Sequence, residues 1–162
     1  MNNRGVTFLE LIVVLAIIGI LSALAVPDLS AFTGKLYLET AVRGVSTNLR
    51  EMKMRATLDR SNYTIYFDPA NNSYDLPGWR FSLPVGIRFG FGPGVLGPPA
   101  NPGQTPDADG VTFPSNKATF YALGSNSIGT IYITNDDHLT MAISMSITGR
   151  VKIWRWDGAT WI

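Results

Sequence analysis

Residues Gly5 to Pro27 read GVTFLELIVVLAIIGILSALAVP. From residue 11 to 26 this stretch has no charged side chain, and extending it back to Val6 adds only Glu10 as an ionisable group. A helix over residues 6–26 is about 30 Å long, which matches the hydrocarbon core of a bilayer. Arg4 precedes it, so the positive-inside rule predicts a cytoplasmic N-terminus and export of the following residues.

Glu10 is the informative residue in this span, because a carboxylate among apolar side chains costs about 2.5 to 3.5 kcal/mol on insertion scales. Such a carboxylate needs a cation. Arg4 is the one basic residue near it in the sequence. A chain cut after Gly5 would instead present a free α-amine on Val6, one helical turn from Glu10, because residues four apart share a helix face.

The run Gly5-Val6-Thr7-Phe8-Leu9-Glu10, followed by the apolar stretch and Pro27, resembles the N-terminus of type IV prepilins and of type II secretion pseudopilins. The resemblance implies that a prepilin peptidase cuts after Gly5 and that the new amine of Val6 is methylated. It also implies that Glu10 pairs with such an amine, in its own or a neighbouring subunit, and sets axial register. Val6 stands where the family usually has Phe. Pro27 lies where helices of the family bend, and a proline inside a helix removes a hydrogen bond.

Three other interpretations of the stretch compete with this one. A plain signal anchor leaves Glu10 without a purpose. A secretory signal peptide is compatible with Ala23-Leu24-Ala25, which fits a small-x-small cleavage site, but it places Pro27 at the third mature position. A buried helix of a soluble protein is disfavoured by the length of the apolar run.

Beyond Pro27 the apolar residues become periodic and then give way to strand patterns. Steps of three and four predict one stripe on an amphipathic helix that continues to about Leu58. Its predicted members are Leu29, Phe32, Leu36, Leu38, Val42, Val45, Leu49, Met52 and Ala56. From Tyr63 the sequence predicts antiparallel strands over residues 63–68, 73–76, 80–83, 87–91, 119–123, 129–134, 139–147 and 151–156.

These patterns predict an α+β fold in which a long N-terminal helix packs against an antiparallel sheet. The expected organisation is a leader peptide (1–5), a transmembrane or filament-core helix (6–27), an amphipathic helix (28–58) and a periplasmic β-rich head (59–162). In residues 139–147 one face is apolar and the other small or polar, as in a sheet covered by a helix on one side. Residues 92–110 hold five prolines and five glycines, which predicts a long loop.

The C-terminal half also resembles a family branch. Phe120-Tyr121-Ala122-Leu123-Gly124, Gly129-Thr130-Ile131-Tyr132-Ile133 and Ser146-Ile147-Thr148-Gly149-Arg150-Val151-Lys152-Ile153 resemble the GspH/FimT pseudopilins and minor pilins. That branch tends to end with a strand, a Gly-Arg turn and a last strand. The loop 92–110 has no counterpart in the resemblance.

Composition and motifs give little support for catalysis. The chain has no cysteine, and its 13 basic residues nearly balance 12 acidic ones, so no global field attracts nucleic acid. The single histidine, His138, lies in a predicted surface turn. Asp107-Ala108-Asp109-Gly110 offers oxygen ligands but is too short for an EF-hand loop. We therefore predict a protein without enzymatic activity, cofactor or resident metal.

The basic tail suggests one binding hypothesis. Arg150, Lys152 and Arg155 lie beside Trp154, Trp156 and Trp161, and cations with aromatic rings can contact DNA through phosphates and stacking. Some FimT-like minor pilins are DNA receptors with a Gly-Arg-x-Arg element, and Gly149-Arg150-Val151-Lys152 resembles it with Lys for the second Arg. The alternative is that the tryptophans pack on the sheet while the cations face water.

The resemblance implies a structural subunit of a type II secretion pseudopilus, or alternatively a FimT/FimU-like minor pilin of a type IV pilus that binds DNA. Its implied partners are other pilins or pseudopilins, the prepilin peptidase, an inner-membrane assembly platform and membrane lipid. The implied location is the inner membrane, with a single pass and a periplasmic head, and then the periplasmic filament.

Overall fold

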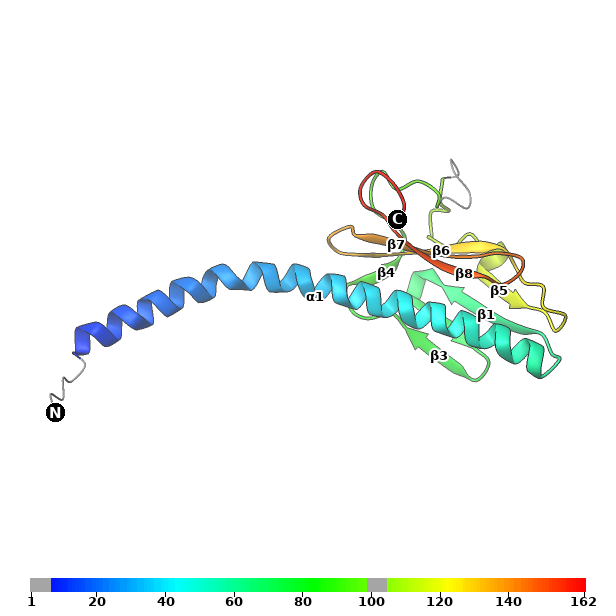
Figure 1. Ribbon diagram of the computed structural model, residues 1–162, viewed down its shortest axis with the longest axis horizontal. Coiled ribbons are helices and arrows are strands. Elements are labelled where there is room, and N and C mark those ends of the chain that lie inside the picture. Colours follow the sequence, from blue (N-terminus) through cyan, green and yellow to red (C-terminus); the bar gives the residue numbers. More distant parts are fainter. Residues whose placement is uncertain (1–6, 99–104) are drawn as a thin grey trace. The chain divides into compact units, whose positions relative to one another are not determined.

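The structure is a computed structural model that describes residues 7–98 and 105–162, without the side chains of residues 23–31. It holds one long helix, α1, and eight strands in the described residues (Figure 1). Their bounds are α1 Phe8–Leu58, β1 Tyr63–Asp68, β2 Ser73–Leu76, β3 Trp79–Ser82, β4 Ile87–Phe89, β5 Lys117–Phe120, β6 Gly129–Asn135, β7 Thr140–Met145 and β8 Val151–Arg155.

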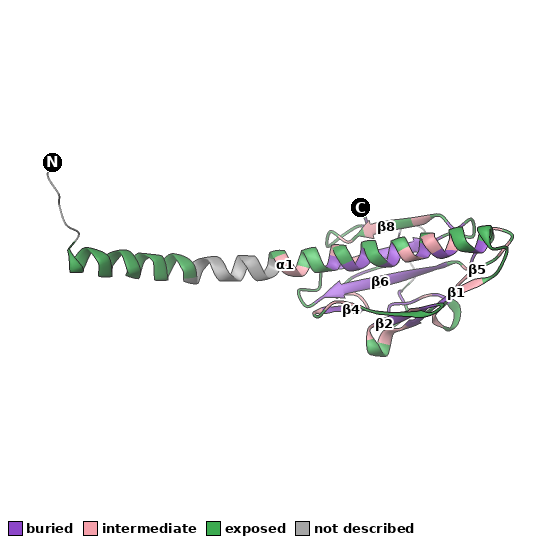
Figure 2. Ribbon diagram, turned by 90° about the horizontal axis from the view of Figure 1, so that it is seen from below, coloured by how far each residue is buried: buried purple, intermediate pink, exposed green. Residues whose placement is uncertain are grey.

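The chain divides into two compact units, Met1–Thr33 and Gly34–Ile162, and α1 runs through both. In the second unit, the head, α1 buries a single stripe of side chains (Figure 2). Their spacing of three and four places them on one face of the helix. The buried residues are Leu38, Ala41, Val42, Val45, Leu49, Met52 and Ala56. The predicted stripe is therefore confirmed from Leu38 onward, whereas Phe32 and Leu36 are exposed because they lie off this face.

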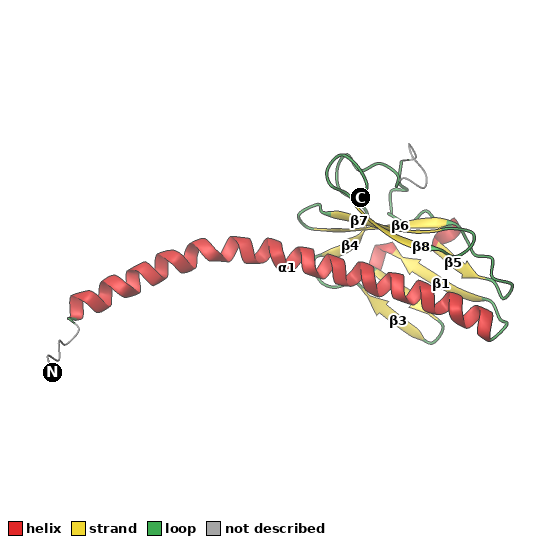
Figure 3. Cartoon of the chain, in the orientation of Figure 1, coloured by secondary structure: helices red, strands yellow, loops and turns green. Residues whose placement is uncertain are grey.

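Two four-stranded antiparallel sheets form the rest of the head (Figure 3). The first sheet has the order β3-β2-β1-β5 and the second the order β4-β6-β7-β8. The chain therefore enters the second sheet at β4, returns to the first at β5 and then builds β6, β7 and β8. The eight predicted strands are confirmed: β1 and β2 have the predicted bounds, and the ends of the others differ by up to three residues.

The main core lies between the buried face of α1 and the two sheets. Fully buried side chains from all three meet there, among them Leu49 of the helix, Phe120 of the first sheet and Ile143 of the second. Phe67 joins the sheets through its ring contacts with Phe89 and Phe113, whose centroids both lie 6.0 Å away. The predicted α+β fold, a helix packed on antiparallel strands, is thus confirmed.

The second sheet differs from the expectation of one solvated face. Ala142, on the small-residue face of β7, is buried in a second apolar cluster, and Ser144 on the same face is buried beside Trp154. Burial raises the pKa of the Tyr132 phenol in this cluster, and the Asp107 carboxylate adds to the effect. The members of the cluster are Val95, Tyr132, Ala142 and Trp161, with Phe91, Trp154 and Trp156 packed at its margin.

The described residues of the predicted loop 92–110 contain no helix or strand, as the proline and glycine content predicts. The loop nevertheless contributes to the second cluster. Val95 is buried in it, and the indole Nε1 of Trp161 donates a hydrogen bond of 2.8 Å to the carbonyl oxygen of Leu96. Residues Val95 and Leu96 of the loop therefore contact Trp161 near the C-terminus.

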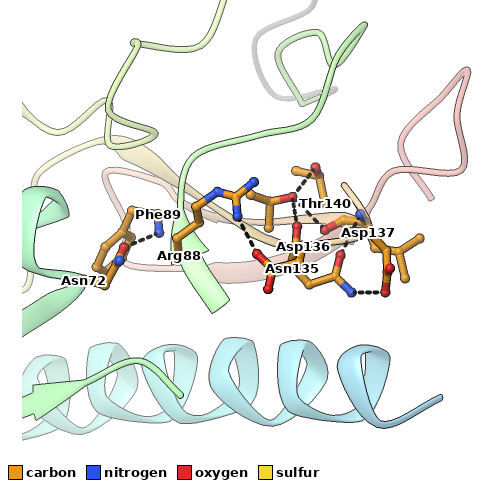
Figure 4. A network of polar contacts seen from close by, with 9 residues as sticks. Asn72, Arg88, Phe89, Asn135, Asp136, Asp137 and Thr140 are labelled. Carbon is orange, nitrogen blue, oxygen red and sulfur yellow. Dashed lines mark hydrogen bonds and ion pairs between the residues drawn. The ribbon is translucent and has the colours of Figure 1, made fainter. Parts of the chain in front are cut away.

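A polar network holds β4, the edge strand of the second sheet, in place (Figure 4). Arg88 of β4 pairs with Asp136 at 2.8 Å, and the Phe89 N–H donates to Asn72 Oδ1 at 3.1 Å. Asn72 has a positive φ of 47°, a conformation that asparagine tolerates better than most residues. The short strand β4 is therefore tied both to the turn after β6 and to the turn before β2.

Candidate functional site

The N-terminal part of α1 begins with a side-chain cap. The hydroxyl of Thr7 accepts a hydrogen bond of 3.2 Å from the backbone N–H of Glu10. This satisfies one of the amide groups that a helix start leaves without an intrahelical partner. The pattern Thr-x-x-Glu is the sequence signal from which this role of Thr7 could have been predicted.

From Phe8 to Leu21, the large apolar side chains of α1 are exposed on every face of the helix. They include five consecutive residues, Leu11 to Leu15, so no single side of the helix is polar. Fully burying one side chain of this kind stabilises by about 1.5 to 3 kcal/mol. A helix that is apolar all round is normally buried. We name residues 8–21 the apolar segment.

Among the described residues, no helix is both long enough and apolar enough to cross a membrane.

Glu10 is an exposed carboxylate inside the apolar segment, in the first turn of α1. It forms no ion pair with any residue that the structure describes. Its position near the helix N-terminus is favourable, because the helix dipole stabilises negative charge there by about 0.3 to 1 kcal/mol. The carboxylate is thus well placed for the helix but lacks a cationic partner in the described part of the chain.

The structure describes little of the other predicted N-terminal site residues, Gly5, Val6 and Pro27. Gly5 and Val6 lie outside the described residues, so the cleavage and methylation predictions stay predictions. α1 is continuous through Pro27, whose side chain is outside the description. The predicted kink at Pro27 therefore also stays a prediction.

On the head, the second sheet carries a groove with two cations. Arg150 and Lys152 line it together with Trp154, and its volume is about 660 Å³. The Lys152 ammonium lies 5.2 Å from the centroid of the Trp154 ring, a cation–π distance, and the Trp154 Nε1 donates to Ser144 Oγ at 2.8 Å. The groove thus presents positive charge above a fixed aromatic ring.

The third predicted cation, Arg155, lies on the other face of β8. The ladder pairs Lys152 with Ser144 and Arg155 with Met141, and successive strand residues point to opposite faces. Arg155 lines a separate groove with Glu39 of α1. The structure thus brings Arg150 and Lys152 together and separates Arg155 from them, while the predicted packing of the tryptophans on the sheet is confirmed.

The remaining polar candidates occupy turns. His138 is exposed and has a positive φ of 62°, as part of the turn between β6 and β7. Asp109 accepts hydrogen bonds at both carboxylate oxygens, from Val111 N and Asn116 Nδ2, so it already has partners. No group of three or more acidic or histidine side chains in the described residues could hold a metal ion.

Comparison with known proteins agrees with the N-terminal pattern. Residues 1–26 match the family model described as the prokaryotic N-terminal methylation motif. The chain is 35% identical over 105 residues to the pilin-like protein PilA1 of Thermus thermophilus. The aligned region covers 57% of this chain and 64% of the relative. It is 34% identical over 74 residues to two fimbrial proteins of Pseudomonas aeruginosa. The aligned region covers 46% of this chain and 47% of each relative.

Among solved structures, the minor pseudopilin EpsH from the type 2 secretion system of Vibrio cholerae overlaps 72% of this chain and 94% of its own. The TM-score is 0.49 and the sequence identity is 11%. The N-terminal motif and the sequence relatives show that this chain is similar to pilin-like proteins. It spans about half to two thirds of the curated relatives that it matches.

Proposed function

We propose that this chain is a filament subunit that assembles through the apolar segment of α1, and that its filament is a type II secretion pseudopilus. In that filament it serves as a minor, GspH-like pseudopilin that supports protein export. The apolar segment carries the proposal, because residues 8–21 expose large apolar side chains on every face. Membrane lipid before assembly, and the helices of neighbouring subunits after it, would both cover these side chains.

Processing completes the proposed mechanism. A prepilin peptidase cuts after Gly5 and removes the leader (1–5), so that methylated Val6 becomes the N-terminus. The described cap supports this, because Thr7 caps a helix that begins at Phe8, two residues after Val6. The charge of the new amine lies close to the Glu10 carboxylate of its own or a neighbouring subunit. In an apolar surrounding this attraction is several times stronger than in water, and it sets axial register.

The proposed organisation and location follow from the same mechanism. Residues 6–27 lie in the inner membrane with the N-terminus cytoplasmic, residues 28–58 form the amphipathic helix, and residues 59–162 form the periplasmic β-rich part of the head. An inner-membrane assembly platform then moves the subunit from lipid into the periplasmic filament. The motif over residues 1–26 and the pilin-like relatives support this sequence of events.

Glu10→Ala tests the proposal in the host. We expect normal cleavage after Gly5 and normal membrane insertion, but at least a ten-fold loss of incorporation into filaments. The reason is that removing one partner of a buried charge pair costs about 2 to 5 kcal/mol. Glu39→Ala, which removes a carboxylate from the head part of α1, is the control and should incorporate normally. Normal incorporation of Glu10→Ala, or residues 1–5 still attached to the mature protein, would contradict the proposal.

A FimT/FimU-like minor pilin that binds DNA is the second candidate function. The observation in its favour is the groove in which Arg150, Lys152 and Trp154 meet. Two cations and an indole ring match the phosphate and base chemistry of a nucleic acid strand. Arg155 adds nothing to this groove, because it lies on the opposite face of β8.

A further inference from the structure

Three turns converge at the end of the head where α1 finishes (Figure 1). They are the α1–β1 turn (59–62), the β5–β6 connection (121–128) and the β7–β8 turn (146–150). Asn62 Oδ1 accepts from the Ala122 N–H at 3.0 Å, which joins the first turn to the second. The buried Asn126 joins the second to the third, because its backbone N–H and its Nδ2 both donate to the Ile147 carbonyl. We name these three turns the turn-end surface.

The turn-end surface exposes large apolar side chains. Leu123 is 98% exposed at the tip of a tight turn in which the Gly124 N–H donates to the Tyr121 carbonyl at 2.9 Å. Ile147 is more than half exposed in the β7–β8 turn, where the Gly149 N–H donates to the Ser146 carbonyl oxygen at 2.7 Å. Leu58 and Ile128 are also more than half exposed. These hydrogen bonds fix the backbone of both turns. The exposed positions of Leu123 and Ile147 are therefore set by the fold.

The charges at the same end are mostly positive. Arg60, Arg150 and Lys152 are exposed there, and the Lys53 ammonium reaches the Thr148 carbonyl at 2.8 Å. The acidic residue at this end is Asp59, whose Oδ2 accepts a hydrogen bond of 2.6 Å from the Tyr63 hydroxyl. Protruding aliphatic side chains and an excess of cations are thus combined on one surface.

We propose that the turn-end surface docks onto an anionic lipid surface. Insertion of exposed aliphatic side chains, together with attraction of nearby cations to anionic headgroups, is the chemistry of peripheral membrane binding. The protruding Leu123, with Ile128 and Ile147 beside the cations of the groove, fits a soft bilayer, whereas protein interfaces favour tryptophan, tyrosine and arginine in packed pockets. A nucleic acid would use the cations and Trp154 but would gain nothing from Leu123.

The test uses the full chain with its N-terminal helix held in nanodiscs of phosphatidylcholine. Separate vesicles of phosphatidylglycerol and phosphatidylcholine are added, and co-sedimentation of the protein is measured against vesicles of phosphatidylcholine alone. We expect binding that requires phosphatidylglycerol. Leu123→Ser with Ile147→Ser should lower it at least ten-fold. Arg150→Gln with Lys152→Gln should lower it by about five-fold for each cation removed.

Val85→Ser is the matched control, because Val85 is an apolar loop residue that is 97% exposed and lies between β3 and β4. It should bind as the parent chain does. Loss of binding on Val85→Ser as well, or no loss on Leu123→Ser with Ile147→Ser, would overturn the proposal. Binding that a short DNA duplex displaces, and that depends on the two cations alone, would also overturn it and favour the nucleic acid candidate.

Discussion

Gly129→Ala is expected to destabilise the head through a steric clash alone. Gly129 begins β6, and a Cβ atom at this position would lie 2.5 Å from Cγ and from Cδ1 of Phe113. Its backbone φ lies outside the left-handed region, so alanine is not strained by backbone conformation there. Phe113 cannot move aside easily, because it is buried and its ring stacks on Phe67.

The magnitude follows from the cost of inserting a methyl group into a packed core, which is about 1 to 3 kcal/mol. For a head of this size each kcal/mol lowers the melting temperature by about 4 °C, so we expect a loss of roughly 4 to 12 °C. Gly44→Ala is the matched control with the opposite sign. A Cβ at Gly44 meets nothing within 4 Å in the interior of α1, so alanine should stabilise by about 0.8 to 1 kcal/mol.

Thermal unfolding of the detergent-solubilised full chain, followed by near-UV circular dichroism, measures both changes. Adding Phe113→Leu to Gly129→Ala tests the cause, because a smaller side chain at residue 113 relieves the clash. The double variant should be more stable than the sum of the single effects predicts, by about 0.5 to 3 kcal/mol. Strict additivity, or an unchanged melting temperature for Gly129→Ala, would refute the steric explanation.

Two further predictions concern the core and the C-terminal turn. Leu49→Ala removes a fully buried side chain of α1 and should cost about 2 to 5 kcal/mol in urea unfolding, whereas Met54→Ala on the exposed face should change stability by less than about 0.5 kcal/mol. Backbone N–H groups of Thr160 and Ala159 lower the pKa of Asp157, so its stabilising effect is complete above the ordinary carboxyl pKa of about 3.9 and is lost as the pH falls through the lower folded value. Melting temperatures between pH 6 and pH 2.5 should therefore fall less for Asp157→Asn than for the parent chain, and equal slopes would refute this.

Periodicity was sufficient to predict the elements that touch the main core. The stripe from Leu38 to Ala56 has helical spacing, and β1 alternates buried Ile65 and Phe67 with more exposed neighbours. Both patterns arise because one face of each element meets the core. The prediction failed at Phe32 and Leu36, because the step from Leu36 to Leu38 is two residues and places them off the buried face of the helix.

The second apolar cluster could not be predicted from local pattern. It joins Val95 in a loop, Tyr132 in β6 and Trp161 near the C-terminus, which are far apart in the sequence. Ala142 and Ser144 look like solvated positions on their strand, but the cluster covers Ala142 and Trp154 at its margin covers Ser144. The separation of Arg155 from Lys152 was, in contrast, predictable, because three residues along a strand reverse the face.

α1 carries two different hydrophobic patterns, and the difference indicates where each part finds its contacts. From Leu38 to Ala56 one stripe is buried and the remaining faces are polar or exposed, so the sheets of the same chain satisfy it. From Phe8 to Leu21 the side chains are apolar on all faces, and in the head the same helix needs only one face for its strands. A single sheet could cover one side of such a helix and would leave the others in water. Complete burial of the apolar segment therefore requires surroundings on every side, which lipid or a bundle of identical helices can supply. In the proposed assembly the same surroundings would enclose Glu10, so its carboxylate would need a cation within reach.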